Sequence, residues 1–211
     1  MRRPVSTVVG TLAAMPAPNI NTDQIIPSAW LRTATADLGN GLFGSQRYDE
    51  AGSERPDFIL NQPGWRNARI LLAGENFGCG SSREAAVWAL VQFGVGCVLA
   101  PSFADIFYEN AFRNGLVAGV IDADAFEDLR RAAAAGPASY AVDLASGTIT
   151  GPDGTRWAVS VPASRARALM RGDDEIAITL AMQPEIDAHF DRSRAATPWL
   201  FPESLMERPS R

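Results

Sequence analysis

The chain has few of the residues that build metal centres and disulfide frameworks. Its 211 residues include two cysteines, Cys79 and Cys97, and one histidine, His189. Two thiols are too few for the three or four thiolates that hold an iron–sulfur cluster, and one histidine does not suit a zinc site built from histidine and cysteine. The sequence therefore predicts no metal site. Two cysteines without an export signal also indicate a reducing, cytoplasmic setting.

Long apolar runs and an excess of positive charge are also missing. No stretch reaches the roughly 18 apolar residues of a membrane span, and no uninterrupted apolar region follows the basic start of the chain. The net charge of -5 argues against a general nucleic-acid binder, which would need a basic patch. The content of 46% hydrophobic and 20% charged residues is that of a globular protein with a sizeable core.

The middle of the chain alternates between strand-like and helix-like segments. Apolar runs at 70–73, 97–100 and 116–121 are separated by helical patterns at 84–93 and 103–113, the second with Ser102 as its expected N-cap. A β-α-β-α-β order predicts a parallel sheet with ligands at the carboxyl ends of its strands. The predicted class is therefore α/β, with a parallel βαβαβ core.

The flanking segments add strands, helices and two irregular regions. The patterns predict a strand at 5–12, a helix at 125–135, hairpin strands at 140–144 and 156–161, and helices at 164–171 and 184–193. Residues 31–55 are rich in turn formers and predict a flexible loop, and residues 196–211 predict a C-terminal tail. No repeat or second domain is indicated, so residues 1–211 are predicted to form a single domain.

The most informative segment is the glycine-rich loop Gly74–Arg83, which joins the first core strand to the first core helix. Backbone N–H groups and the positive end of a helix dipole favour an anion at such a place. Arg83 adds a planar guanidinium that matches a carboxylate or a phosphate. The loop lacks the Gly-Lys-Ser/Thr end of a Walker A loop and the Gly-x-Gly-x-x-Gly order of a dinucleotide loop. It therefore predicts a site for a small acid.

Two other interpretations of this loop stay open. Ser81 and Glu84 have the spacing of a capping box, in which Ser81 would be a purely structural N-cap. Cys79, at a helix N-terminus beside Arg83, has the surroundings of a reactive thiolate. That second interpretation describes a thiol enzyme that works alone.

Three blocks of sequence together resemble a known family. They are Phe-Gly-Cys-Gly-Ser-Ser-Arg-Glu at 77–84, Asn-Thr-Asp-Gln-Ile-Ile-Pro at 21–27, and Ala-Pro-Ser-Phe-Ala-Asp-Ile-Phe-Tyr-Glu-Asn at 100–110. In order and spacing they resemble the small, swivelling subunit of 3-isopropylmalate dehydratase, in the aconitase superfamily, over roughly residues 5–200. The resemblance implies a swivelling domain with β/β/α layers.

The resemblance also implies a reaction and a partner. The family's enzymes are hydro-lyases that isomerise 2-isopropylmalate and 3-isopropylmalate by dehydration and rehydration, in leucine biosynthesis. A separate large subunit carries a [4Fe–4S] cluster, and the small subunit closes over it. This chain would then hold no cofactor itself and would act only in a heterodimer or heterotetramer.

The same resemblance implies roles for individual residues. Ser81 would be the catalytic base, acting as an alkoxide, and Asp23 a second catalytic carboxylate. The substrate would be bound by Gly80, Ser82 and Arg83, and by Arg32, which lies where the family has its substrate-selecting loop. Trp30 and Phe43 have side chains that suit an apolar wall for an alkyl group, or the core.

One departure from the family's pattern bears on the substrate. The family has Arg-Glu-His-Ala-Pro after the two serines, and this chain has Ala85 and Val87 in place of the histidine and the proline. Ala85 cannot carry a proton or donate a side-chain hydrogen bond. The alternatives are a dehydratase for another 2-hydroxy dicarboxylic acid, of the citramalate, homoaconitate or methylated malate type, or a non-catalytic paralogue that binds acids.

Overall fold

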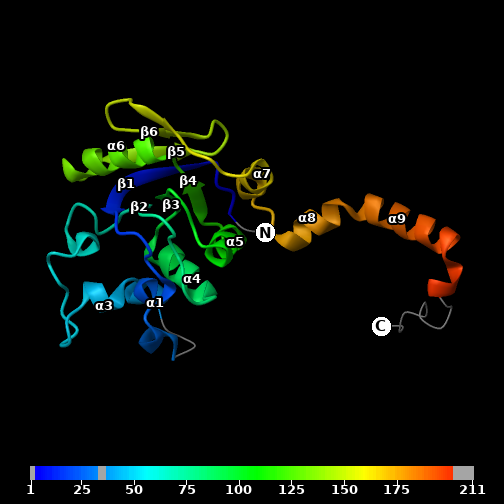
Figure 1. Ribbon diagram of the computed structural model, residues 1–211, viewed down its shortest axis with the longest axis horizontal. Helices are drawn as coiled ribbons and strands as arrows, with labels where there is room; N and C mark the ends of the chain where they lie inside the picture. The colour runs from blue at the N-terminus through cyan, green and yellow to red at the C-terminus, as the bar shows by residue number, and fades with distance from the viewer. Residues whose placement is uncertain (1–2, 33–36, 202–211) are drawn as a thin grey trace. The chain divides into compact units, whose positions relative to one another are not determined.

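The computed structural model describes residues 3–32 and 37–201 of the chain. It contains two compact units, which divide between Gly172 and Asp173 (Figure 1). Residues 33–36 of the loop predicted at 31–55, and residues 202–211 of the predicted tail, lie outside the described part. The flexibility of that loop stays a prediction.

One mixed sheet of seven strands forms the centre of the larger unit. Its strands are β1 (Thr7–Met15), β2 (Ile70–Ala73), β3 (Cys97–Ala100), β4 (Val117–Val120), β5 (Ser139–Asp143), β6 (Thr148–Thr150) and β7 (Arg156–Ala158). They lie in the order β4-β3-β2-β1-β5-β6-β7. The half from β4 to β1 is parallel, and β5, β6 and β7 continue it as antiparallel strands.

The parallel half is the predicted βαβαβ core. Helix α4 (Glu84–Phe93) joins β2 to β3, and helix α5 (Asp105–Arg113) joins β3 to β4. All four residues of β2 and of β3 are buried, as expected for parallel strands that are covered on both faces. In Figure 1, α4 and α5 lie below these strands, and α6 (Ala123–Ala134) lies above them. The α/β prediction is confirmed.

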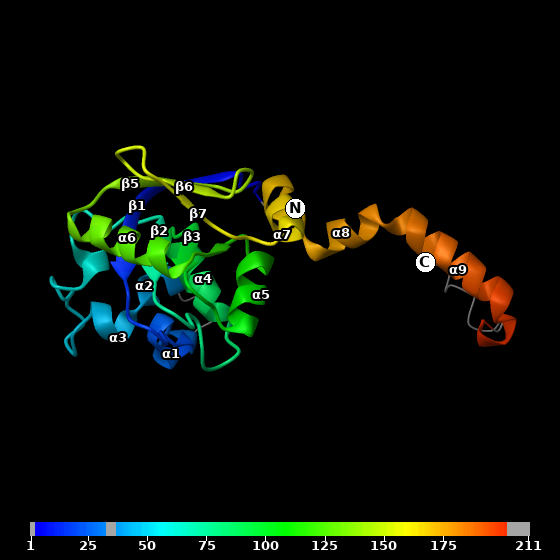
Figure 2. The same ribbon diagram turned by 45° about the horizontal axis from the view of Figure 1, so that its top comes forward.

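The antiparallel half packs on α6. Strands β5 and β6 lie beside α6 in both views (Figures 1 and 2). The indole Nε1 of Trp157, on β7, donates to a carboxylate oxygen of Asp128, on α6, at 3.4 Å. The hairpin strands predicted at 140–144 and 156–161 are therefore present, although β7 ends three residues early, at Ala158.

The cap predicted at the start of α5 is wrong. The helix begins at Asp105, and its N-cap residue, Ala104, makes no side-chain hydrogen bond. The Ser102 hydroxyl, which was expected to cap this helix, instead accepts a hydrogen bond from the Asn76 backbone N–H at 2.9 Å. Ser102 therefore stabilises the glycine-rich loop and not the helix.

The segment between β1 and β2 is more regular than its composition indicates. It contains α1 (Thr22–Ile25), α2 (Leu38–Gly41), α3 (Gly44–Arg47) and the 3-10 helices η1 (Ser28–Leu31) and η2 (Ile59–Asn61). The buried guanidinium of Arg47 donates to the Asn61 side chain at 3.1 Å and to the Gly39 and Leu42 carbonyls at 3.4 Å each. These bonds satisfy carbonyl groups at the end of α2 and stabilise a segment that lacks periodic apolar residues.

Helix α7 (Ala163–Arg171) packs on α5 through Arg165. The guanidinium carbon of Arg165 lies 4.9 Å from the Phe112 ring centroid and 5.9 Å from that of Tyr108. The same guanidinium pairs with Glu109, and this hydrogen bond lowers the pKa of the Glu109 carboxyl. Arg165 thus combines an ion pair with ring stacking.

We expect Arg165→Ala to lower the free energy of unfolding by about 1–2 kcal/mol at pH 7, because it removes the stacking of the guanidinium on two rings. The loss should be smaller near pH 4. A carboxyl with a lowered folded pKa stabilises the fold above its unfolded pKa, and this contribution disappears as the pH falls through the folded value. Urea unfolding at the two pH values measures the difference.

Arg130→Ala is the matched control for this prediction. Arg130 pairs with Glu127 one turn away on α6, and no ring contact is present beneath it in the described structure. Its removal should lower the free energy of unfolding much less than Arg165→Ala does, because an exposed ion pair within one helix contributes little. Equal losses for the two variants at pH 7 would show that the rings contribute nothing.

The smaller unit is helical in its described part. It contains α8 (Glu175–Ala181), α9 (Gln183–Ala196) and the 3-10 helix η3 (Pro198–Leu200). Residues 173–201 include no buried side chain. The exposed large apolar residues here are Ile176, Ile178, Leu180, Met182, Phe190, Trp199 and Leu200. No helix in the described part of the chain is long and apolar enough to cross a membrane.

Candidate active site

The three sequence blocks that carry the family resemblance meet at the carboxyl end of β2. The loop after β2 is held on one side by the Gly78 N–H, which donates to the Ile20 carbonyl at 2.8 Å. On its other side, the Phe77 N–H donates to the Ser102 carbonyl at 3.1 Å. The loop therefore lies between the block at 21–27 and the block at 100–110. This is the carboxyl end of a parallel strand, where α/β proteins bind their ligands.

Tight backbone turns give the loop its path. Positive φ angles occur at Asn76 (55°), Gly78 (79°) and Gly80 (91°). Gly78 also packs directly against Phe107 of α5, because a Cβ atom at Gly78 would lie 2.2 Å from the Phe107 ring. Two of the loop's glycines are therefore required by backbone conformation, and one of these also by close packing.

Asp23 and Arg83, 60 residues apart in the sequence, form an ion pair across the site. Nη1 of Arg83 donates a hydrogen bond to Oδ1 of Asp23. The other guanidinium N–H groups have no partner within the described structure. Helix α1 is capped by the side chains of Asn21 and Gln24, and not by Asp23. The Asp23 carboxylate is thus free to orient Arg83.

Ser81 and Ser82 lie exposed on the loop, next to Arg83. Neither hydroxyl makes a hydrogen bond to any described residue. The capping-box interpretation is wrong, because α4 begins at Glu84 with Arg83 as its N-cap residue and no side-chain cap. A serine that stabilises no helix end is available for chemistry.

Within the described part of the larger unit, the Cys79 thiol makes no hydrogen bond to a general base. Its Sγ atom lies 3.5 Å from the Asn19 carbonyl oxygen, to which a protonated thiol donates. His189, the only histidine of the sequence, is an exposed residue of α9 in the smaller unit, where its ring lies 3.5 Å from the Ser193 hydroxyl. Cys97 is buried in β3, and burial raises the pKa of its thiol. These surroundings therefore favour Ser81 over Cys79 as the reactive group of the loop.

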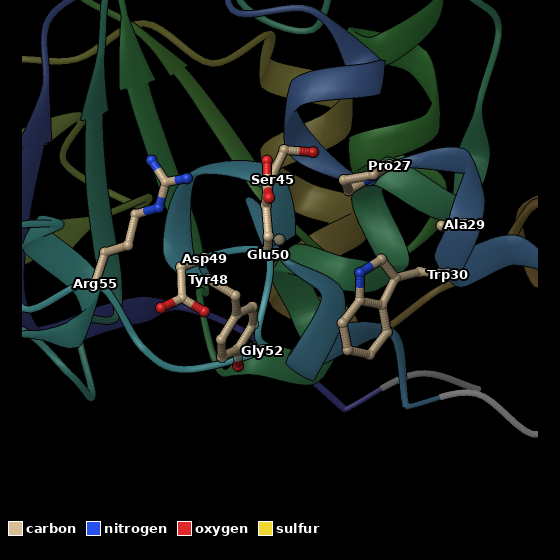
Figure 3. Close-up of a pocket in the computed structure, with 10 residues that line it drawn as sticks. Pro27, Ala29, Trp30, Ser45, Tyr48, Asp49, Glu50, Gly52 and Arg55 are labelled. Atoms are coloured by element: carbon tan, nitrogen blue, oxygen red, sulfur yellow. The ribbon is translucent and has the colours of Figure 1, made fainter.

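The residues expected to contact the substrate's side chain come from the segment between β1 and β2, which precedes the loop in the sequence. Arg32 is exposed at the end of η1, and no described hydrogen bond or ion pair joins it to the loop. Phe43 is fully buried, so of the two predicted alternatives it is a core residue. Trp30 does line a pocket, and its ring centroid lies 6.4 Å from that of Tyr48 (Figure 3).

That pocket is open, has a volume of about 480 Å³ and contains no residue of the glycine-rich loop. Its walls are Pro27, Ala29, Trp30, Gly44, Ser45, Tyr48, Asp49, Glu50, Gly52 and Arg55. Figure 3 shows the Trp30 and Tyr48 rings together with the Arg55 and Asp49 side chains around it. The pocket is a feature separate from the loop that carries Ser81 and Arg83.

The two residues that depart from the family's pattern have different surroundings. Val87, which stands where the family has a proline, is fully buried in α4 and packs in the core. Ala85 is half-buried in the first turn of α4, close in sequence to Arg83. Any chemical consequence of the departure therefore lies at Ala85.

Sequence reasoning missed two residues that fix the ends of this site. The Asn114 side chain accepts from the Trp88 indole at 3.0 Å and donates to the Glu84 carboxylate at 2.8 Å, which ties the first turn of α4 to the end of α5. Thr22 bonds to the loop itself. The motif at 21–27 indicated Asp23, but nothing in the sequence signals a contact that spans 59 residues.

Arg83→Lys should lower kcat/KM of the assembled enzyme by about 10- to 100-fold. A lysine keeps the charge but loses the planar fork that serves Asp23 and a second anion together. Steady-state kinetics with the large subunit measures the effect. Arg66→Lys is the control, since Arg66 also pairs with a carboxylate, that of Glu54, through two hydrogen bonds on the surface. An equal loss in both variants would contradict a specific role for Arg83.

The donor set of this chain does not form a metal centre. Within the described residues, no group of three or more His, Cys, Asp or Glu side chains is placed to hold a metal ion. The site instead offers hydroxyls, backbone N–H groups and one guanidinium. These groups bind anions and move protons.

Comparison with known proteins agrees with this geometry. The model of the Aconitase C-terminal domain family matches residues 2–123. A 3-isopropylmalate dehydratase small subunit from Azorhizobium caulinodans is 45% identical over 92% of this chain and 98% of its own length. Its counterpart from Dinoroseobacter shibae is 47% identical over 92% and 97%.

A solved structure shows the same fold. The crystal structure of 3-isopropylmalate dehydratase from Methanocaldococcus jannaschii superposes with a TM-score of 0.62 and 26% identity, over 87% of this chain and 98% of that one. Family model, relatives and fold agree. The chain belongs to the 3-isopropylmalate dehydratase small-subunit family, whose members carry the aconitase C-terminal domain.

Proposed function

We propose that this chain is the small subunit of a cytoplasmic hydro-lyase that interconverts 2-isopropylmalate and 3-isopropylmalate, by dehydration and rehydration, in leucine biosynthesis. The observation that carries this proposal is the exposed Ser81 hydroxyl, free of hydrogen bonds to described residues, on a loop where Arg83 is oriented by Asp23. The names of the similar small subunits from Azorhizobium and Dinoroseobacter support this choice of substrate.

The reaction requires removal of a weakly acidic proton from carbon. Of the two exposed serines of the loop, Ser81 is the one to which the family resemblance gives the role of base, and as an alkoxide it can accept that proton. The positive end of α4, the neighbouring backbone N–H groups and the Arg83 guanidinium all favour the charged form of the hydroxyl. Ser81 holds the proton during dehydration and returns it during rehydration.

Substrate carboxylates need donors that stay fixed while charge develops. The unpaired N–H groups of Arg83 and the Ser82 hydroxyl supply such donors beside Ser81. Asp23 holds the guanidinium in place, so little reorganisation is required when the substrate binds.

The remaining requirement is met by a partner. A [4Fe–4S] cluster in a large subunit, which forms a heterodimer or heterotetramer with this chain, supplies the Lewis acid that helps hydroxide to leave. The small-subunit names of the relatives imply such a partner. Arg32, on the exposed segment after η1, is the residue of this chain that we assign to the far end of the substrate.

Ala85 supports a second candidate within the same reaction class. A half-buried alanine, where the family has a histidine, changes the space and the hydrogen bonding beside Arg83. Such a change fits a related 2-hydroxy dicarboxylic acid, of the citramalate, homoaconitate or methylated malate type. The substrate that gives the highest kcat/KM distinguishes the two candidates.

The test is anaerobic reconstitution with the large subunit encoded by the same organism, assayed for hydration of 2-isopropylmaleate. Each chain alone is the control. Turnover that requires both chains supports the proposal. A complex that turns over only another hydroxy acid supports the second candidate, and a complex that binds substrate without any turnover indicates the non-catalytic paralogue.

A further inference from the structure

Thr22 bonds to the catalytic loop at two points. Its backbone N–H donates to the Cys79 carbonyl at 2.9 Å, and its Oγ1 hydroxyl donates to the Ser81 carbonyl at 3.1 Å. Thr22 itself is only 2% exposed, whereas Ser81 lies at the surface. The Ser81 carbonyl also accepts from the Arg83 backbone N–H at 2.8 Å, so Thr22 and Arg83 together hold it, and Thr22 bonds to the carbonyl groups on both sides of Gly80.

The direction of these carbonyls determines the direction of the next N–H groups. No peptide bond in the described structure is cis, and in a trans peptide the N–H points opposite to the C=O. The Cys79 carbonyl faces Thr22, so the Gly80 N–H points away from it. The Ser81 carbonyl also faces Thr22, so the Ser82 N–H points away as well.

Both N–H groups are unpaired. Neither Gly80 N–H nor Ser82 N–H donates a hydrogen bond to a described residue, and both residues are exposed. The φ angle of 91° at Gly80 allows the N–H groups of the Cys79–Gly80 and Ser81–Ser82 peptides to point in the same direction. Two free backbone donors thus lie on the side of the loop opposite Thr22, on either side of Ser81.

We propose that Thr22 is a positioning residue, whose hydroxyl orients the Ser81–Ser82 peptide so that the Gly80 and Ser82 N–H groups together bind a carboxylate of the substrate. This inference rests on the proposed function, because it assigns the donors to the acid on which Ser81 acts. The Thr22 hydroxyl is the part of the arrangement that a side-chain substitution removes, since the backbone N–H bonds from Thr22 to Cys79 and from Arg83 to Ser81 survive any substitution except proline.

Thr22→Val tests the proposal, because valine keeps the shape of threonine and removes the hydroxyl. In the assembled enzyme, it should raise the KM for 2-isopropylmaleate and the Kd for isopropylsuccinate, a dicarboxylate without the hydroxyl, by about tenfold. The kcat should change by less than threefold, since the donors bind ground state and transition state alike. Thr22→Ser should restore both constants to within twofold.

Thr148→Val is the matched control. The Thr148 hydroxyl also donates to a backbone carbonyl, that of Ser146 at 3.4 Å, but it lies on β6 in the antiparallel half of the sheet. Its removal should leave KM, kcat and Kd unchanged. A purely structural role for Thr22 would lower the thermal stability or the affinity for the large subunit without changing the Kd for isopropylsuccinate, and that result would overturn the proposal.

A crystal structure of the Thr22→Val chain tests the same inference without any substrate. The Ser81–Ser82 peptide should be rotated, or present in two orientations. An unchanged peptide would overturn the inference, whatever acid the enzyme accepts. Conversely, an enzyme that fails to act on 2-isopropylmaleate, but shows the rotated peptide, would overturn the proposed function and leave the role of Thr22 intact.

Discussion

Replacing Ser81 by alanine should lower kcat of the assembled enzyme by about 10³-fold, which is within the range contributed by a positioned base. The substitution removes one oxygen atom that makes no hydrogen bond to any described residue. The fold therefore has nothing to lose, and the free energy of unfolding should stay within about 0.5 kcal/mol of the wild-type value. KM should change little, because the carboxylate donors remain.

The neighbouring variant Ser82→Ala is the control for this experiment. Ser82 is equally exposed and equally free of described side-chain hydrogen bonds, but its proposed role is to bind the substrate and not to move a proton. Its main effect should be on KM. If Ser81→Ala keeps full activity in a complex with normal subunit affinity, the base is another group and the proposed mechanism fails.

A thiol mechanism gives a different result in the same assay. Cys79→Ser should leave the activity of the assembled enzyme within about threefold of wild type, because the Cys79 thiol faces the Asn19 carbonyl and no described base. Loss of activity in Cys79→Ser with full activity in Ser81→Ala would reverse the assignment. The pair of variants therefore decides between a Ser81 base and a Cys79 nucleophile.

The core could be predicted from the sequence because periodicity and burial agree there. Strands β2 and β3 are short apolar runs bounded by turn residues, and α4 has the bounds, 84–93, that the helical pattern predicts. The N-terminal caps of α4 and α5 could not be predicted. Ser81 and Ser102 have the spacing of caps, but hydrogen bonds to distant segments determine the backbone path before each helix.

The site shows the same division. Ser81, Ser82, Arg83 and Asp23 could be named from motifs, and the structure brings Asp23 and Arg83 into contact. Thr22 could not, because its function depends on which backbone carbonyls face it after folding. A buried hydroxyl that orients a peptide leaves no pattern in the sequence. Residues that act through the backbone are visible only in three dimensions.

Gly78→Ala should destabilise the larger unit more than any other substitution considered for the loop. At a φ of 79°, an alanine costs about 1–2 kcal/mol. Its Cβ atom would also lie 2.2 Å from Cγ and 2.6 Å from Cβ of Phe107, which is 3% exposed. Because the Phe107 Cβ atom is fixed to α5, a change of rotamer cannot relieve the clash, and overpacking adds about 1–3 kcal/mol.

The sum, about 2–5 kcal/mol, is a large part of the stability of an ordinary domain. It should lower the melting temperature by about 5–15 °C and, because the Gly78 N–H bond to Ile20 holds the loop, it should also reduce the affinity for isopropylsuccinate in the assembled enzyme. Gly52→Ala separates the two causes. Gly52 has nearly the same φ, 81°, and a Cβ atom added there would have no other atom within 4 Å, so this variant should show the conformational cost alone. Equal melting temperatures for the two variants would mean that α5 moves freely to accommodate the methyl group, and that Phe107 does not hold the catalytic loop in place.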